Sequence, residues 1–240
     1  MLHLERGTCI TIDLDEVPSL EFICSALIPL ISKNSYDGLE IVDLRDPENP
    51  FRNTLCVGKL SIPGAGSFHV KVVQPPDTDS EYLPSVLSKF PELEEDPYVL
   101  VPAIIPVVSF GEPDPMFYVH LTKWVDSQET LAQFIVSKWF HGSHAAVKTC
   151  LFQFGKFLRG FHSKYPGLQH TDMNPSNVLM VAATCGVSIF ILADCSGLDD
   201  QVGSDFQTFI ESLKVLAEGG FGDEFLTLAT SAFTEGYETP

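Results

Sequence analysis

The stretch H-T-D-M-N-P-S-N-V, residues 170–178, constrains this chain more than any other segment. It places Asp172 two residues after a histidine and Asn177 five residues later. An apolar run, 189–193, follows and leads directly to Asp194. This order indicates a loop that carries a carboxylate and an amide, then a hydrophobic strand that ends in a second carboxylate. Oxygen ligands suit a hard cation that keeps several waters. The side chains of Asn177 and Asp194 are two ligands suited to such a cation.

A helix is predicted directly upstream, over residues 144–165. Its apolar residues recur at a spacing of three and four: Val147, Cys150, Leu151, Phe154, Phe157, Leu158 and Phe161. Pro166-Gly167 then ends the helix. A helix, a loop, a short strand and a second aspartate thus follow one another. A simpler alternative stays open, in which Asp172 and Asn177 only form turns near Pro175 and His170 is an ordinary loop residue.

This order resembles the protein-kinase-like superfamily, in its small atypical members: aminoglycoside and fructosamine kinases, RIO kinases and the kinase of the KEOPS complex. Those proteins share an H-G-D-x-x-x-x-N loop and a strand that ends in I-D-[FW]-[GS]. Here Thr171 stands in place of the glycine, and Asp194-Cys195-Ser196-Gly197 in place of Asp-Phe-Gly. The resemblance is tight over 165–197 and looser as far as Tyr237. Before residue 140 it rests on the order of elements.

The resemblance implies an α+β, two-lobed protein-kinase-like fold, with an antiparallel-sheet N-lobe and a minimal helical C-lobe. We expect an N-terminal extension over 1–35 that packs on the N-lobe, an N-lobe over 36–122 and a reduced C-lobe over 123–240. The cofactors implied are ATP and Mg²⁺.

The resemblance also assigns roles to the three residues of the motif. Asp172 would orient the acceptor hydroxyl, while Asn177 and Asp194 would hold Mg²⁺ on the phosphates.

Lys71 lies in a predicted strand, Ser67–Val73, where the resemblance expects the lysine that contacts the α- and β-phosphates. Glu81, on the following helix, is the candidate acid that pairs with this lysine, although Glu92, Glu94 and Glu95 compete for that role. The segment 121–124 would be the hinge between the lobes, so that the backbone of Leu121 and Lys123 would meet adenine.

Two segments depart from the family pattern. The predicted lid over the phosphates, 45–51, has two prolines, two carboxylates besides Arg45, and no glycine. Glycine amides approach phosphate closely because they carry no side chain, so this loop weakens the expectation of tight ATP binding. In another register the lid is Pro63–Gly66, but Lys71 then lies too close behind it. The short segment after Asp194 leaves no long platform for a peptide.

The remaining predicted elements follow from periodicity and turn residues. They are a strand over 9–14, a helix over 18–33 with a kink or end at Pro29, strands over 39–44, 54–60, 104–110 and 116–125, a helix over 80–90, a helix that starts in a capping-box-like arrangement of Asp126 and Glu129, a helix capped by Ser204 and ended by Gly219-Gly220, and a last helix over 223–233.

The composition narrows the choice of partners. The net charge of −18 over 240 residues argues against binding to nucleic acid or to an anionic membrane, since both require clustered Lys and Arg. The six cysteines form no C-x-x-C pair, and no secretory leader is evident, so we expect a cytoplasmic protein. The acceptor would be a small molecule or an unusual protein.

Three functions are compatible with these observations. The leading hypothesis is an ATP- and Mg²⁺-dependent phosphotransferase, with Asp172, Lys71 and Glu81 as the catalytic residues. The alternative is a pseudokinase that keeps the fold as a nucleotide- or protein-binding module, which the glycine-free lid favours. A third possibility is the transfer of AMP in place of phosphate.

Overall fold

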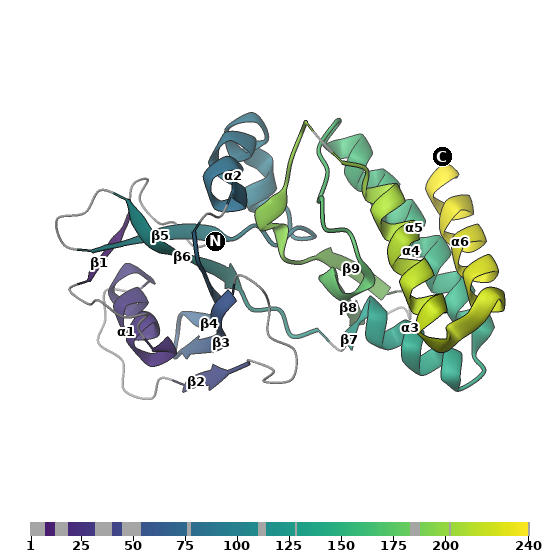
Figure 1. Cartoon of the computed structure of the whole chain (residues 1–240), viewed down its shortest axis with the longest axis horizontal. Helices are drawn as coiled ribbons and strands as arrows, with labels where there is room; N and C mark the ends of the chain where they lie inside the picture. Colours follow the sequence, from purple (N-terminus) through teal and green to yellow (C-terminus); the bar gives the residue numbers. More distant parts are fainter. Residues whose placement is uncertain are drawn as a thin grey trace. The chain divides into compact units, whose positions relative to one another are not determined.

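The computed structural model describes residues 8–12, 19–31, 40–44, 54–75, 78–109, 114–127, 129–182, 188–201 and 203–239. The chain forms two compact units (Figure 1). The first comprises Met1–Tyr82 and Val101–Val125, and the second comprises Leu83–Leu100 and Asp126–Pro240. The described part of the first unit is dominated by a mainly antiparallel sheet, and that of the second by helices. The predicted α+β class is confirmed.

The sheet of the first unit has six described strands in the order β1-β5-β6-β4-β3-β2. Their bounds are Ile10–Ile12 (β1), Glu40–Asp43 (β2), Thr54–Ile62 (β3), Gly66–Val73 (β4), Ala103–Ser109 (β5) and Pro115–Lys123 (β6). Only the pair of β1 and β5 is parallel. The strands predicted for this sheet are all present, and their ends differ from the prediction by at most two residues. The predicted lid, 45–51, lies outside the described residues.

Helix α1 (Leu20–Ile31) packs on one face of this sheet. Its buried residues are Leu20, Ile23, Cys24 and Leu27. They share a core with alternate residues of β4, namely Phe68, Val70 and Val72, because side chains along a strand point to opposite faces in turn. Each fully buried Leu or Ile contributes about 1.5–3 kcal/mol to stability. Pro29 lies in the last turn, and the helix ends two residues later.

After residue 125, the described part of the second unit contains four α-helices and a small sheet. The helices are α3 (Leu131–Phe140), α4 (His144–Lys164), α5 (Asp205–Leu216) and α6 (Gly222–Glu238). The sheet has the order β7-β8-β9, with bounds Glu129–Thr130, Val178–Ala182 and Ser188–Leu192. The helix predicted over 144–165 is confirmed as α4, and Gly167 follows it with φ 86°. No described helix is long and apolar enough to cross a membrane.

The start of α3 differs from the prediction. Asp126 and Glu129 do not form a capping box. The N-cap is Thr130, whose hydroxyl accepts from the amide of Gln133 at 3.2 Å, while the Gln133 side chain accepts from the Thr130 amide at 2.8 Å. The reason is strand pairing: Glu129 and Thr130 form β7 against β8, so the helix cannot begin before Leu131.

Helix α2 (Thr78–Lys89) matches the helix predicted over 80–90 and contains Pro84. Its C-terminal half and the residues after it, as far as Leu100, belong to the second unit and are bonded to other segments of that unit. Lys89 Nζ lies 2.5 Å from Asp200 Oδ2. The backbone of Leu192 donates to Tyr98 O and accepts from Leu100 N, both at 2.8 Å. These bonds fix the end of β9, two residues before Asp194.

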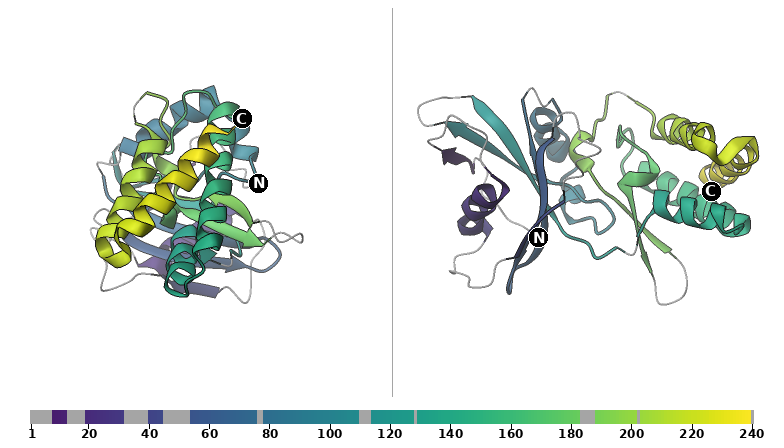
Figure 2. Two further views of the ribbon diagram at one scale, coloured as in Figure 1. Left: turned by 90° about the vertical axis from the view of Figure 1, so that its right-hand side faces the viewer. Right: turned by 60° about the horizontal axis from the view of Figure 1, so that its bottom comes forward.

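Helix α6 is longer than predicted and lies beside α4 (Figure 2). It begins at Gly222, after a π-type turn over Ala217–Phe221 in which Gly220 has φ 121°. It continues to Glu238 because Ala232, Phe233 and Gly236 are buried in the second unit. Two glycines, Gly155 of α4 and Gly236 of α6, allow the two helices to approach each other closely. A Cβ on Gly155 of α4 would meet the carbonyl oxygen of Phe233 and the amide nitrogen of Tyr237.

Gly155→Ala is therefore expected to lower the free energy of unfolding by about 1–3 kcal/mol, because the new methyl group would meet backbone atoms that cannot rotate away. Gly160→Ala, on the same helix, is the matched control, since a Cβ there meets nothing within 4 Å. It should raise stability by roughly 0.5–1 kcal/mol through helix propensity. Thermal unfolding followed by circular dichroism compares the two variants. Equal effects would mean that α4 and α6 are not in close contact.

Candidate functional site

Asp172 is held by two neighbouring amide side chains. Asn177 Nδ2 donates to Asp172 Oδ2 at 2.8 Å and to its backbone oxygen at 2.9 Å. Asn174 Nδ2 donates to Asp172 Oδ1 at 3.1 Å. Because the Asn177 nitrogen is used in this way, its Oδ1 is the atom that can act as a ligand. The arrangement fixes the Asp172 carboxylate while the residue stays exposed.

The turn around Pro175 is capped by a different residue. Asn174 Oδ1 accepts from the amide of Ser176 at 2.9 Å, at the start of the short 3-10 helix Pro175–Asn177. The side chain that closes the turn is therefore that of Asn174. This weakens the simpler alternative, in which Asp172 and Asn177 serve only as turn formers.

Asp194 and Asn177 lie at the same end of the β8–β9 hairpin. The register pairs Val178 with Leu192, and the amide of Ala193 donates to the backbone oxygen of Asn177 at 2.8 Å. Asp194 is the next residue and is exposed. The buried ring of His170 donates through Nε2 to the oxygen of Ala193 at 2.8 Å. The structure thus brings the loop of Asp172, Asn177 and the strand end of Asp194 together.

Two non-glycine residues at this place have positive φ: Thr171 at 70° and Asp194 at 54°. A β-branched residue rarely adopts this conformation, and such backbone costs of order 1–3 kcal/mol unless its surroundings hold it. The Thr171 hydroxyl donates to Gly197 O at 2.7 Å, and its amide donates to Asp205 Oδ1 at 3.0 Å. Thr171 is therefore held by its own hydrogen bonds in a left-handed backbone conformation that glycine adopts more readily.

Cys195, the residue after Asp194, is fully buried and its Sγ lies 3.4 Å from Leu192 O. Burial raises the pKa of this thiol well above its ordinary value, with a smaller contribution from the Asp194 carboxylate. The thiol stays protonated, so it is not a nucleophile. Cys9, Cys24 and Cys150 are also free thiols, and Cys185 lies outside the described part of the chain.

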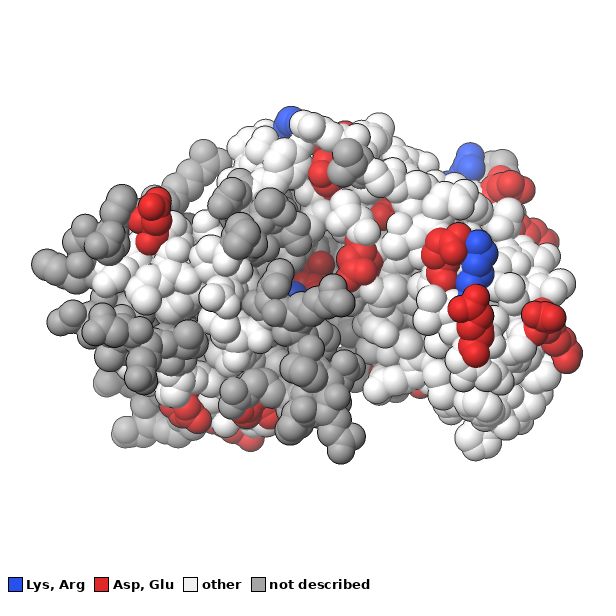
Figure 3. All heavy atoms as spheres, viewed as in Figure 1, with Lys and Arg blue, Asp and Glu red and all other residues white. Residues whose placement is uncertain are grey.

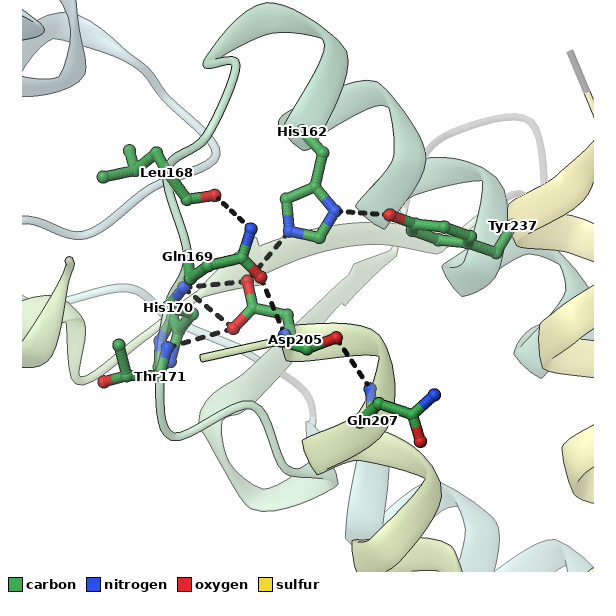
Figure 4. A network of polar contacts seen from close by, with 9 residues as sticks. His162, Leu168, Gln169, His170, Thr171, Asp205, Gln207 and Tyr237 are labelled. Carbon is green, nitrogen blue, oxygen red and sulfur yellow. Dashed lines mark hydrogen bonds and ion pairs between the residues drawn. The ribbon is translucent and has the colours of Figure 1, made fainter. Parts of the chain in front are cut away.

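Asp205, the first residue of α5, is a site residue that the sequence analysis missed (Figure 4). Its side chain is 0% exposed. The amide of His170 donates to both of its oxygens, at 2.9 and 2.8 Å, and the amide of Thr171 donates to Oδ1. In the sequence, an aspartate directly after the Ser204 cap is typical of a solvated first helical turn. No local signal marks it as buried.

The residues fit a magnesium ion better than a metal caged entirely by protein. In the described part of the chain, no group of three or more His, Cys, Asp and Glu could hold a metal. Mg²⁺ needs only one or two protein oxygens, because it keeps waters and binds substrate phosphates. Asn177 Oδ1 and the Asp194 carboxylate are oxygen donors of this kind.

The other predicted site residues lie in or next to the first unit. Lys71 is half-buried on β4, on the sheet face opposite to α1, and it pairs with the buried His120 of β6. Leu121 is 2% exposed in the sheet core, and Lys123 is exposed at the end of β6. Glu81 lies on α2, and its side chain is outside the described part. The roles of these four residues stay predictions.

The surface of the chain is acidic, as its composition requires. On the face drawn in Figure 3, Asp and Glu side chains are spread widely and Lys and Arg are few. An acidic surface repels a polyanion, and a bound cation offsets this repulsion.

No protein-family model and no curated protein matches this sequence. Among solved structures, the BubR1 kinase domain is similar to this chain, with a TM-score of 0.49 and 13% sequence identity. The matched region covers 81% of this chain and 55% of that one. The chain thus spans little more than half the length of that kinase domain.

Proposed function

We propose that this chain is an ATP- and Mg²⁺-dependent phosphotransferase of kinase-like fold, which acts on a small molecule or an unusual protein acceptor. One observation carries the proposal: Asp172, fixed by the amides of Asn174 and Asn177, lies in a loop whose end is bonded to the residue before Asp194. This is the arrangement that a phosphoryl transfer site needs, with one carboxylate for the acceptor and separate oxygen ligands for the cation.

Each residue has one task in this proposal. The Asp172 carboxylate accepts a hydrogen bond from the acceptor hydroxyl and aligns it for attack. Asn177 Oδ1 and the Asp194 carboxylate hold Mg²⁺, which neutralises the phosphate charge when it is bound with ATP. Lys71, supported by Glu81, contributes a further positive charge, and the backbone of Leu121 and Lys123 meets adenine. Catalysis comes from positioning and charge stabilisation.

The alternative function is that of a pseudokinase, a binding module for a nucleotide or a protein. The composition of 45–51 favours it, since prolines remove amide donors and carboxylates repel phosphate. Against it, the polar positions of the motif are all filled, and the backbone at Thr171 has a positive φ, a conformation that suits the glycine of the H-G-D pattern. We therefore favour the enzyme.

We expect calorimetry to detect ATP binding only in the presence of Mg²⁺, and Asp194→Asn to abolish it while the fold survives. Asparagine tolerates positive φ as aspartate does, and the side chain is exposed, so the substitution removes charge without straining the backbone.

Asp223→Asn, an exposed carboxylate in the first turn of α6, is the control and should bind as the wild type does. Circular dichroism checks the fold of both variants. No binding at millimolar ATP with or without Mg²⁺ would contradict the proposed function. Unfolding of Asp194→Asn would show that Asp194 is structural.

A further inference from the structure

Asp205 is linked to more than the loop of Asp172. Its Oδ2 lies 2.9 Å from Nε2 of His162 on α4, and Nδ1 of the same ring lies 2.8 Å from the hydroxyl of Tyr237 on α6 (Figure 4). The His162 side chain is 13% exposed. Three segments distant in the sequence are thus joined in one line of hydrogen bonds: the last turn of α6, the last turn of α4 and the start of α5.

The donors and acceptors along this line are fixed by chemistry. Backbone N–H groups reach both oxygens of Asp205, and an ionised carboxylate only accepts. His162 must therefore donate through Nε2. Burial raises the pKa of the Tyr237 hydroxyl, against an opposing effect of the Arg159 guanidinium. Tyr237 thus keeps its proton and can donate it to His162 Nδ1.

The position of Tyr237 is fixed independently of its hydroxyl. Arg159 Nη1 donates to the backbone oxygen of Tyr237 at 3.1 Å. Gly236, the preceding residue, lies so close to α4 that a Cβ there would meet the carbonyl oxygen of Phe152. The Tyr237 ring also contacts Phe206, with the centroids 4.9 Å apart. A phenylalanine at 237 would therefore keep its place and lose only the hydrogen bond.

We propose that Tyr237 is a positioning residue of the phosphotransfer site: it sets the ring of His162, and through His162 and Asp205 it orients the loop of Asp172. The proposal rests on the function proposed above. Asp205 holds the amide of Thr171, one residue before Asp172, in a conformation that threonine does not adopt unaided. When His162 no longer donates, the Asp205 carboxylate loses the contact that sets its rotation, and Thr171 relaxes.

The effect should fall on turnover rather than on nucleotide binding. Asn177 and Asp194 are held by the β8–β9 hairpin and by the bond from Ala193 to Asn177. Neither the pairing of this hairpin nor this hydrogen bond involves Asp205. A relaxed Thr171 therefore displaces Asp172 from the acceptor and leaves the metal ligands in place, which lowers kcat and leaves the KM for ATP unchanged.

The experiment compares His162→Leu, His162→Gln and Tyr237→Phe by amide hydrogen exchange, measured by NMR at His170 and Thr171. In His162→Leu, the two amides should exchange about tenfold faster or more, as the loss of a hydrogen bond to a charged group implies. Tyr237→Phe should give a smaller increase of the same kind. His162→Gln should restore protection, because its amide can donate to Asp205 and its oxygen can accept from Tyr237.

Tyr98→Phe and His141→Ala, an exposed tyrosine and an exposed histidine of the same unit, are controls that should change nothing. Amides of Leu151 and Leu158 in α4 report global opening, so that a local effect is recognised. Unchanged exchange at His170 and Thr171 in Tyr237→Phe, with faster exchange in His162→Leu, would overturn the proposal, and so would unchanged exchange in both variants.

Steady-state kinetics of the same variants separate this inference from the proposed function. A fall in kcat at constant KM for ATP supports the positioning role, and an equal loss of ATP affinity contradicts it. A wild type that transfers no phosphate would overturn the proposed function. Faster amide exchange in the variants would still show that the hydrogen bonds from Tyr237 through His162 to Asp205 hold this loop in place.

Discussion

Asp205→Ala should lower the free energy of unfolding of the helical unit by about 3–5 kcal/mol, since each hydrogen bond to a charged group contributes about 1.5–3 kcal/mol and several are lost together. The carboxylate is 0% exposed and accepts from the amides of His170 and Thr171 and from the ring of His162. Alanine removes the acceptor of all three donors and leaves the fully buried amide of His170 without a partner, which costs the full desolvation energy of that group.

Urea unfolding followed by tryptophan fluorescence measures this effect. The chain has two tryptophans, and Trp139 of the second unit stacks on His144 with the ring centroids 3.9 Å apart. A Trp124→Phe background therefore isolates the signal of the helical unit. Asp223→Ala, an exposed acid in the first turn of α6, is the control and should cost less than about 1 kcal/mol.

Asp205→Asn tests the chemistry more narrowly. Asparagine keeps the shape of the side chain, but its NH₂ group replaces one acceptor oxygen and faces a donor. The free energy of unfolding of Asp205→Asn should therefore lie between those of the wild type and of Asp205→Ala. A loss below about 1 kcal/mol for Asp205→Ala, smaller than the cost expected for buried unsatisfied donors, would mean that Asp205 does not support the loop.

The elements that local patterns specify were predicted well. The apolar spacing of α4 and its Pro166-Gly167 end lie within one stretch of sequence, so both the element and its limits follow from neighbouring residues. The same holds for β3 and β4, where alternation and a glycine turn give the hairpin. Each of these segments carries its own instructions, and tertiary contacts agree with them.

Errors arise where a distant partner decides. Asp126 and Glu129 match a capping pattern, but the pairing of Glu129 and Thr130 with β8, about 50 residues later, moves the helix start. The end of α6 depends on its contact with Phe152 of α4. The burial of Asp205 depends on the loop of Asp172, whose residues His170 and Thr171 donate to its carboxylate. A single sequence holds no local record of these partners.

The candidate site divides along the same line. One β-hairpin separates Asp172 and Asn177 from Asp194, so that the local register of the hairpin brings the three residues together. The positive φ of Thr171 could not be anticipated, since its residue type argues against it. Lys71, Glu81, Leu121 and Lys123 act in the proposal only through contacts between distant segments, which spacing along the chain does not specify.

Asp172→Ala should reduce turnover by roughly 10²–10⁴-fold, the contribution typical of a positioned acid–base group, and should leave ATP affinity nearly unchanged. Asp172 is the one carboxylate of the motif that Asn174 and Asn177 hold in place, and in the proposal it contacts the acceptor hydroxyl. The proposed metal ligands, Asn177 Oδ1 and Asp194, remain. A phosphorylation screen of small molecules and calorimetry with Mg²⁺-ATP measure the two quantities.

Lys71→Ala is the comparison that gives the result its meaning. In the proposal this side chain neutralises phosphate charge, so its loss should weaken ATP binding as well as turnover. An equal loss of ATP affinity in Asp172→Ala and Lys71→Ala would contradict the division of roles. A wild type that binds Mg²⁺-ATP and phosphorylates nothing, with Asp172→Ala binding it equally well, would favour the pseudokinase. In that case Asp172 and its two asparagines would serve only to shape the loop, because a carboxylate without an acceptor to align contributes nothing to transfer.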